Sequence, residues 1–508
     1  MRKNGVLLHI TSLPSPYGVG TMGQAAYDFV DFLNGSGQSY WQILPIHPTS
    51  YGDSPYASYS TFAGNPYFID FGLLVKDGLL IPEEYTWLDW SQKEDEVDFG
   101  FLYNNRFNVL RLATDRFLKN PDAEYEKFLE DNKDWVEDYA LYMALKKHFD
   151  GKPWYEWDDE FKFYDPKKKK DWVVKFKEDV DFYEVLQYFF LKQWKAMKEY
   201  ANENGVEMIG DLPIYVARDS VDVWSHPELF ALDADLNPER VAGCPPDGFS
   251  ADGQLWGNPL YNWPEHKKTG YDWWTRRIAY LLNMYDVLRI DHFRGFDSYY
   301  AIPYGDKTAK NGKWLEGPGM DLFSTIEKKL GKQRIIAEDL GFLTPSVKKL
   351  LADTGFPGMK ILQFAFDSRD AASTDYYPFN YPKNSVAYTG THDNDTIVGW
   401  FENADKDDVA LAKEYLQAND PADYHWNIIR ELMKSPSDYA IVTAQDLLGL
   451  GSEARMNVPS KLGGNWAWRL MPGQLNDEIK DKLLELTKVY KRFPLERLEI
   501  EEAKEETK

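Results

Sequence analysis

The chain has 508 residues, 43% of them hydrophobic, enough for one large domain or for about three ordinary ones. Lys and Arg number 58 against 82 Asp and Glu, and the resulting net charge of −24 argues against nucleic acid and anionic membranes as partners, because both select a basic face. The single cysteine excludes an internal disulfide, and no signal peptide or apolar run of about 18 residues is evident, so we expect a cytoplasmic protein without a membrane span.

Short apolar runs that end in polar residues recur along the chain, and helical patterns separate most of them. The runs predicted to be strands are residues 5–10, 40–46, 206–214, 286–291, 334–339, 359–366, 385–393 and 439–446. The clearest predicted helices are residues 23–34, 271–285, 344–355 and 408–418. Such alternation predicts a parallel α/β sheet, and eight units predict a (β/α)8 TIM barrel with its active site at the carboxyl ends of the strands.

Some stretches fall outside this alternation. Residues 51–205 predict a mainly helical insertion after the second strand, and residues 226–284 predict a further insertion. Within the latter, residues 243–257 contain four glycines with aromatic residues between them, a composition that favours a mobile lid over an active site. The charged tail at 498–508 is expected to fray. We therefore expect one catalytic domain over residues 1–508, without a C-terminal β-sandwich.

Other motifs have simpler explanations. The "GVGTMG" stretch at 18–23 matches a dinucleotide fingerprint, but its glycines come too far after the preceding strand. The "DADLNPERVAGC" stretch begins like a calcium loop, yet Pro238 replaces the required glycine and Cys244 the required glutamate. We expect a hairpin turn there and a packing role for Cys244. The sequence thus suggests no metal and no organic cofactor.

Carboxylates stand at several predicted strand ends, namely Asp211, Asp291, Glu338 and Asp393. Arg289 lies two residues before Asp291, so both side chains point to the same face of the strand, where the guanidinium can keep the carboxylate ionised. Two facing carboxylates favour retaining glycoside chemistry, with one as nucleophile and the other as acid. The abundant aromatic residues in polar surroundings suit a sugar ring, which stacks on one face and hydrogen-bonds at its edge.

Strand parity leaves one question open in this scheme. The neighbours Glu338 and Asp339 point to opposite sides of a regular strand, as do His392 and Asp393. Parity alone therefore does not choose the functional member of either pair.

A series of ordered motifs resembles the 4-α-glucanotransferase family (amylomaltase, or disproportionating enzyme) of the α-amylase clan over nearly the whole chain. They include "GVLLHITSLPSPYGVGTMG", "GDLPIYVARDSVDVW", "LRIDHFRGF", "IIAEDLG", "GTHDNDT" and "NWAWR". The resemblance implies transfer of an α-1,4-glucan segment from a donor maltodextrin to the 4-hydroxyl of an acceptor, with maltose, maltodextrins and amylose as substrates. It also implies that Asp291 is the nucleophile, Glu338 the general acid/base and Asp393 the transition-state stabiliser.

The same resemblance implies a set of substrate-binding residues. Arg289 and His392 would orient the nucleophile and the donor sugar, and Asp211 would support them from the preceding strand. Further contacts would come from Ser54, Tyr56, Phe249, Gln254, Trp256, His292 and Asn465. The chain departs from the family at Gly248, where many relatives have an aromatic residue, and at Ser460, where glycine is common.

Two alternatives share these features. An α-1,4-glucan hydrolase would use the same first step and then open the glycosyl-enzyme with water. A non-catalytic carbohydrate-binding protein would bind sugar without turnover, but the complete set of three carboxylates argues against it.

Overall fold

The computed structural model describes residues 2–90, 93–246, 250–341, 343–369, 371–459, 461 and 463–494. In this part of the chain, eight parallel strands close into a barrel in the order β1-β12-β11-β10-β9-β6-β3-β2. They are β1 (Lys3–Leu7), β2 (Tyr40–Gln42), β3 (Glu207–Leu212), β6 (Val287–Ile290), β9 (Ile335–Ala337), β10 (Gly358–Ile361), β11 (Ser385–Tyr388) and β12 (Tyr439–Thr443). The predicted (β/α)8 barrel is thus confirmed, and its closure brings the carboxyl ends of all eight strands to one rim.

The strands are short and almost entirely buried, because side chains fill the barrel and helices cover its outside. All four residues of β6 and all four of β11 are buried, for example. The covering helices are α1 (Gln24–Gly35), α11 (Asp272–Met284), α12 (Gly319–Leu330), α13 (Pro345–Thr354), α14 (Ile397–Asn403), α15 (Lys406–Leu416), α16 (Tyr424–Lys434), α17 (Ala444–Leu447) and α18 (Asp477–Val489). The four helices predicted from the sequence correspond to α1, α11, α13 and α15.

Local signals explain where these helices begin and end, as α13 shows. The hydroxyl of Thr344 accepts a hydrogen bond from the backbone N–H of Val347, and Pro345 occupies the first helical position. Gly355 ends the helix in the left-handed conformation, with φ +70°.

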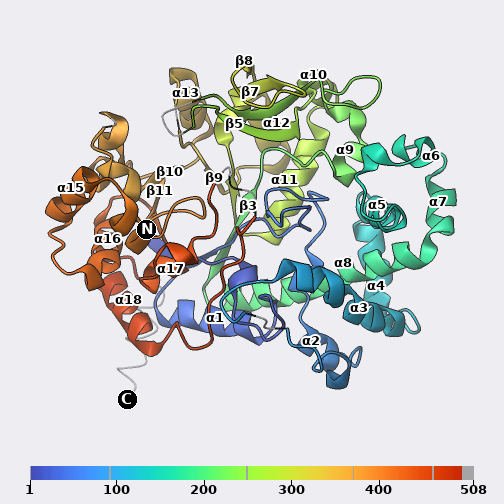
Figure 1. The fold of residues 1–508 in the computed structure, drawn as a ribbon, viewed down its shortest axis with the longest axis horizontal. Helices are drawn as coiled ribbons and strands as arrows, with labels where there is room; N and C mark the ends of the chain where they lie inside the picture. The colour runs from blue at the N-terminus through green and yellow to red at the C-terminus, as the bar shows by residue number, and fades with distance from the viewer. Residues whose placement is uncertain are drawn as a thin grey trace.

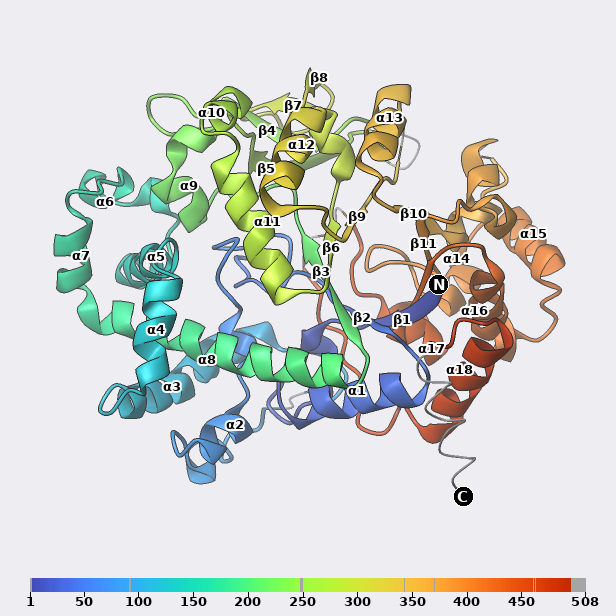
Figure 2. The same cartoon turned by 180° about the vertical axis from the view of Figure 1, so that it is seen from behind.

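A lobe of helices lies between β2 and β3, within the stretch 51–205. It contains α2 (Phe71–Lys76), α3 (Phe99–Phe117), α4 (Ala123–Asp131), α5 (Val136–His148), α6 (Asp159–Lys162), α7 (Lys169–Lys175) and α8 (Lys177–Glu203). The long helix α8 contacts α3, α4 and α5 in the lobe and also α1 and β3 of the barrel, so it joins the two. Figure 1 shows the lobe at one side of the barrel and α15, α16 and α18 at the other, and Figure 2 shows α8 and α11 crossing the back. That this stretch is a separate subdomain stays a prediction.

A small antiparallel sheet stands at the carboxyl rim of the barrel, in the order β5-β4-β7-β8. Its strands are β4 (Arg240–Cys244), β5 (Gln254–Pro259), β7 (Ser298–Pro303) and β8 (Lys313–Glu316). The short helices α9 (Val221–Ser225) and α10 (Trp263–Lys268) flank it along the chain. The sheet matters for the site, because the predicted lid, residues 243–257, begins in β4 and ends in β5, although its residues 247–249 lie outside the described part of the chain. In addition, β7 begins shortly after the predicted nucleophile.

The remaining sequence predictions concern the ends of the chain and membranes. From β12 to residue 494, the described residues form helices and no further strand of a sheet. The predicted tail, residues 498–508, lies outside the described part. No helix among the described residues is long and apolar enough to cross a membrane.

Candidate active site

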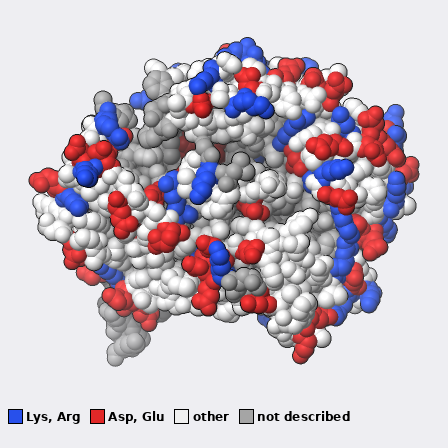
Figure 3. Space-filling view, viewed as in Figure 1, with Lys and Arg blue, Asp and Glu red and all other residues white. Residues whose placement is uncertain are grey.

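A groove of about 700 Å³ opens at the carboxyl rim, between the barrel and the small sheet. The face drawn in Figure 3 is hollowed, with Lys and Arg interspersed among Asp and Glu around the hollow. Most of the predicted site residues line this groove: Ser54, Tyr56, Gln254, Trp256, Asp291, His292, His392 and Asp393. The predicted contact Phe249, with Gly248 beside it, lies outside the described residues, and so does Ser460. The groove is therefore the candidate active site.

Arg289 joins two carboxylates beneath the floor of the groove. Its Nη1 donates to Oδ2 of Asp211 at 2.6 Å, and its Nη2 donates to Oδ1 of Asp291 at 2.9 Å. The pairing of β3 with β6 sets Asp211 beside Arg289, and both side chains are buried. Burial opposes the charge of Arg289, but Asp211 and Asp291 together raise its pKa well above the ordinary value. Asp291 remains partly exposed to the groove, so it is an oriented anion that a substrate can reach.

Glu338 follows β9, and its carboxylate accepts the backbone N–H groups of His292 at 2.7 Å and Leu340 at 2.8 Å. Burial, with the nearby charge of Asp291 as the second cause, raises the pKa of Glu338 to about 7 although Arg289 and both N–H donors oppose the shift. A carboxyl group that exchanges its proton near neutrality suits general acid/base work.

Its neighbour Asp339 is buried and accepts the backbone N–H of Met359 at 2.6 Å, so it faces β10. The structure thereby distinguishes the two neighbours that strand parity left open, since only Glu338 lies beside Asp291.

Asp393 is held by a loop that the sequence alone does not predict to lie near it. Asn457 donates from Nδ2 to Oδ1 of Asp393 at 2.6 Å, and Arg455 donates to its backbone oxygen at 2.6 Å. Nε2 of His392 lies 3.4 Å from Oδ2 of Asp393. Burial alone would raise the pKa of Asp393, but His392 and Asn457 hold it below its ordinary value. The only sequence signal for Asn457 is its position in "RMNVPS", a turn-rich stretch just before "NWAWR".

Tyr56 connects this loop to the Arg289 network. Its ring stacks on His392 with centroids 4.9 Å apart, and its hydroxyl donates to Asp211 at 2.7 Å. The backbone N–H of Tyr56 donates to the hydroxyl of Ser54 at 3.2 Å. The predicted residues Ser54, Tyr56, Asp211 and His392 therefore belong to one connected cluster.

The other side of the groove is formed by β5. Trp256 is 37% exposed, lies edge-on to His292 with ring centroids 4.8 Å apart, and donates from Nε1 to Gln254 at 3.0 Å. An exposed indole beside an amide is a suitable surface for a pyranose ring.

Four described site residues do not line the groove: Asp211, Arg289 and Glu338, which bond to the residues around Asp291, and Asn465. The side chain of Asn465 donates to the backbone oxygen of Lys461 at 2.8 Å and accepts the N–H of Val458 at 3.0 Å. The next residue, Trp466, lines the groove instead, with its ring 5.9 Å from that of Tyr56. Trp466 was not singled out from the sequence, although the motif that contains it was.

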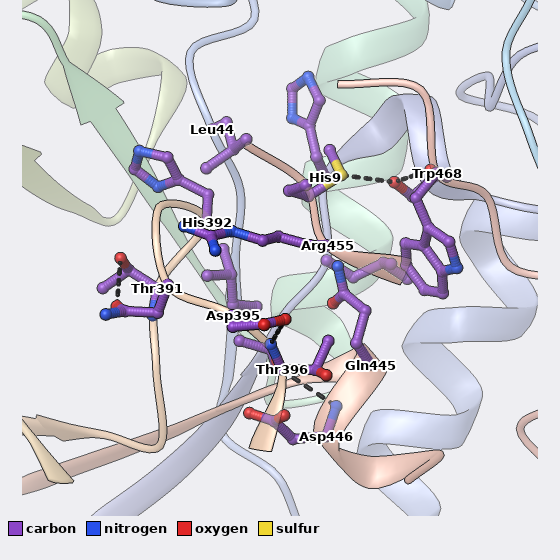
Figure 4. A pocket seen from close by; sticks show the side chains of 16 residues that line it. His9, Leu44, Thr391, His392, Asp395, Thr396, Gln445, Asp446, Arg455 and Trp468 are labelled. Carbon is purple, nitrogen blue, oxygen red and sulfur yellow. Dashed lines mark hydrogen bonds between the residues drawn. The ribbon is translucent and has the colours of Figure 1, made fainter. Parts of the chain in front are cut away.

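A small pocket of about 20 Å³ lies at the Thr391–Thr396 turn (Figure 4). It is lined on one side by His392 and Arg455 and reaches the buried ring of His9, whose pKa is lowered to about 3 by burial and by His392. A cavity of this size holds one water molecule and no sugar. Of these two sites, only the larger groove has room for a sugar. Among the described residues, no group of His, Cys, Asp and Glu could hold a metal ion.

Comparison with known proteins agrees with this geometry. A family model described as 4-alpha-glucanotransferase matches residues 8–475. A 4-alpha-glucanotransferase of Clostridium butyricum is 48% identical, with the match covering 96% of this chain and 100% of that protein, and one of Thermus thermophilus is 43% identical over 97% and 99%. A solved structure of amylomaltase from Streptococcus agalactiae in complex with acarbose matches with a TM-score of 0.94 at 46% identity, covering 97% of this chain and 100% of that one.

Proposed function

The chain belongs to the 4-alpha-glucanotransferase family and transfers segments of α-1,4-glucans, and on this premise we propose that Asp291, Glu338 and Asp393 carry the reaction. The observation that carries the assignment is the position of Arg289, which holds the carboxylate of Asp291 from below while Glu338 lies beside it with a pKa of about 7. One carboxylate is thus fixed as an anion, and the other can hold a proton at neutral pH.

In the first step, Asp291 attacks C1 of the donor sugar and the glycosidic bond breaks. Glu338 gives its proton to the departing oxygen, so the leaving glucan departs with a free 4-hydroxyl. Because Arg289 is fixed by Asp211 as well, the nucleophile does not have to be reoriented during the attack.

In the second step, the ester between Asp291 and the sugar is opened by an acceptor. The negative charge of Asp291 is absent in this intermediate, so one of the causes that raise the pKa of Glu338 is removed. Glu338 then accepts the proton of the acceptor's 4-hydroxyl while that oxygen bonds to C1 and the carboxylate of Asp291 is regenerated. The anomeric configuration is retained after two displacements.

Asp393 is assigned to the 2- and 3-hydroxyls of the donor sugar. Its carboxylate is ionised and oriented by Asn457 and His392, so it can strengthen its hydrogen bonds as positive charge develops on the ring. Tyr56 and Trp466 supply aromatic surface on the same side of the groove, and Ser54 lies beside them.

We assign the acceptor to the side of the groove formed by Trp256, Gln254 and His292. The proposed lid, residues 243–257, would shield the glycosyl-enzyme from water until an acceptor hydroxyl is aligned. Maltose, maltodextrins and amylose are the proposed substrates, by analogy with the relatives, and the Streptococcus agalactiae relative was solved with acarbose. Nucleic acid and membrane are not among the proposed partners, and a cytoplasmic location stays a prediction.

Incubation with maltotriose tests the proposal. Glucose together with a ladder of longer maltodextrins, at a constant number of reducing ends, is the expected result. A net increase in reducing ends would assign the protein to hydrolysis instead, and binding without any product would leave a carbohydrate-binding role.

A further inference from the structure

His292, the residue after the proposed nucleophile, has a left-handed backbone, with φ 52° and ψ 48°. Residues other than glycine rarely adopt this backbone conformation, and where they do, the surrounding structure must maintain it. Here it directs the backbone N–H of His292 at Oε2 of Glu338, at 2.7 Å. The next residue, Phe293, donates its N–H to the backbone oxygen of Glu338 at 3.0 Å. The turn after Asp291 therefore holds the proposed acid/base from two sides.

The ring of His292 is packed against the acceptor side of the groove. Trp256 lies edge-on to it at 4.8 Å, and Tyr215 lies 6.5 Å away. Burial, assisted by the charge of Arg294, lowers the pKa of His292 to about 3, so the ring is neutral at working pH. Its Nε2 is buried without a hydrogen-bond partner among the described residues. Contact with Trp256 and Tyr215, rather than an ion pair, is thus what fixes the ring.

The small sheet links these two elements through the backbone. The His292 turn lies between β6 and β7, β7 pairs with β4, and β4 pairs with β5, which carries Trp256. In addition to this backbone connection, the ring of His292 contacts the ring of Trp256 directly. A displacement of β5 would therefore move the His292 turn in two ways. One is through the pairing of β5 with β4 and of β4 with β7, and the other, more direct, is through the contact between Trp256 and the imidazole of His292.

We propose that His292 is a positioning residue that couples the acceptor-side strand β5 to Glu338. Its ring, held under Trp256, maintains the left-handed turn, and the N–H of that turn orients the carboxylate of Glu338. An acceptor sugar that rests on Trp256 would then also set the geometry of the base that deprotonates it. This inference rests on the proposed function and adds to it a route by which acceptor binding reaches the proton-transfer step.

The charges around Glu338 determine the sign of the expected effect. Arg289 of β6 and Asp291, the residue after β6, face it, and the N–H groups of His292 and Leu340 bond to its carboxylate. The imidazole is neutral, so it contributes no charge of its own. If the N–H of His292 no longer donates to Glu338, the ionised form of Glu338 loses a stabilising hydrogen bond, and the pKa of Glu338 rises. Activity that requires protonated Glu338 would then persist to higher pH.

A pair of substitutions separates the backbone from the ring. His292→Gly and His292→Ala both remove the imidazole, but only glycine adopts the left-handed turn without strain. The measurement is the pH dependence of kcat/KM for maltotriose disproportionation. We expect the basic limb of His292→Ala to lie about one pH unit above that of His292→Gly, which the loss of one hydrogen bond to a carboxylate can produce. Identical pH profiles with equally reduced rates would overturn the proposal, because a merely structural role predicts them.

Trp256→Ala tests the coupling independently and keeps the proposal testable if His292→Ala does not fold. Trp256 is partly exposed, so its truncation should leave the fold intact, which thermal unfolding verifies. We expect Trp256→Ala to shift the basic limb in the wild-type background and to cause no further shift in the His292→Gly background. Equal shifts in both backgrounds would contradict the coupling. A wild-type enzyme that produces no maltodextrin ladder would instead refute the proposed function, so the two failures are distinguishable.

Discussion

Asn457 donates its side-chain N–H to Asp393 at 2.6 Å and thereby fixes one carboxylate oxygen, leaving the other near His392. This bond joins the barrel rim after β11 to a loop more than sixty positions later in the chain. The orientation of the proposed transition-state stabiliser thus depends on a residue that contributes no charge. The relationship can be tested directly.

Asn457→Ala should reduce kcat about 10- to 100-fold, the effect of losing a hydrogen bond to a charged group. Asn457→Asp is the informative companion, because it places a second carboxylate against Asp393 and raises the pKa of Asp393. We expect the acidic limb of the pH profile to move upward in Asn457→Asp and to move less in Asn457→Ala. Initial rates of maltotriose disproportionation between pH 4 and 8 would reveal this order. Unchanged kcat in Asn457→Ala would show that Asp393 is positioned by other groups.

The assignment of the two reacting carboxylates makes a stronger prediction. Asp291→Asn removes the nucleophile and Glu338→Gln removes the transferable proton, so each should reduce turnover by at least about a thousandfold. Product analysis after long incubation with maltotriose would measure the residual activity, and circular dichroism would verify the fold.

The adjacent Asp339→Asn is the matched control for Glu338→Gln. Asp339 bonds to the N–H of Met359 and faces away from the groove. Its replacement should reduce stability while retaining turnover. Near-normal activity in Asp291→Asn or Glu338→Gln would remove that residue from the scheme.

The Arg289 network predicts a loss of stability as well as of activity. Arg289→Ala leaves Asp211, which is 1% exposed, without its ion-pair partner, and breaking such a buried pair costs about 3–5 kcal/mol. Arg334, whose ion pair with Glu207 is partly exposed at the surface, provides the control, and Arg334→Ala should cost about 0–1 kcal/mol. Urea denaturation of both variants would measure the difference. If Arg289→Ala and Arg334→Ala lose similar free energies of unfolding, the buried Arg289 network does not stabilise the fold more than the surface ion pair does.

The sequence predicted the barrel, and most of the residues that it singled out lie together around one groove, because both patterns are encoded locally. Buried strands alternate with helices, and polar residues such as Asp291 and Glu338 directly follow several strands, so that the barrel brings them to the rim. Strand parity put Arg289 and Asp291 on one face, and Arg289 does bond to Asp291. The choice of Glu338 over Asp339 required the resemblance. Alternation along a strand puts the two side chains on opposite sides, but it does not say which side faces the site.

The parts that escaped prediction depend on contacts between distant segments. The small sheet combines strands from two separate stretches, and β5 has an exposed middle, so it lacks the pattern of a buried strand. Asn457 bonds to a residue 64 positions away, and nothing in its own neighbourhood indicates that partner. The left-handed backbone of His292 is likewise invisible in the sequence, because it is imposed by the ring contacts and by Glu338 rather than by a glycine.

The raised pKa of Glu338 also predicts a pH-dependent effect on stability. In the folded protein this pKa is about 7 rather than 4.5, mainly because of burial and then of Asp291. Well below pH 4.5 the group is protonated in the folded and unfolded states alike, and it contributes no penalty. As the pH rises to about 7, the unfolded chain releases this proton first, so the group progressively destabilises the fold. Glu338→Gln has no such proton. We therefore expect the free energy of unfolding of the variant, relative to that of the wild type, to increase between pH 4.5 and 7 and to stay constant above pH 7. Urea denaturation of both proteins at pH 4.5, 6 and 8 would measure the difference, and a gap that is constant across this range would contradict the raised pKa.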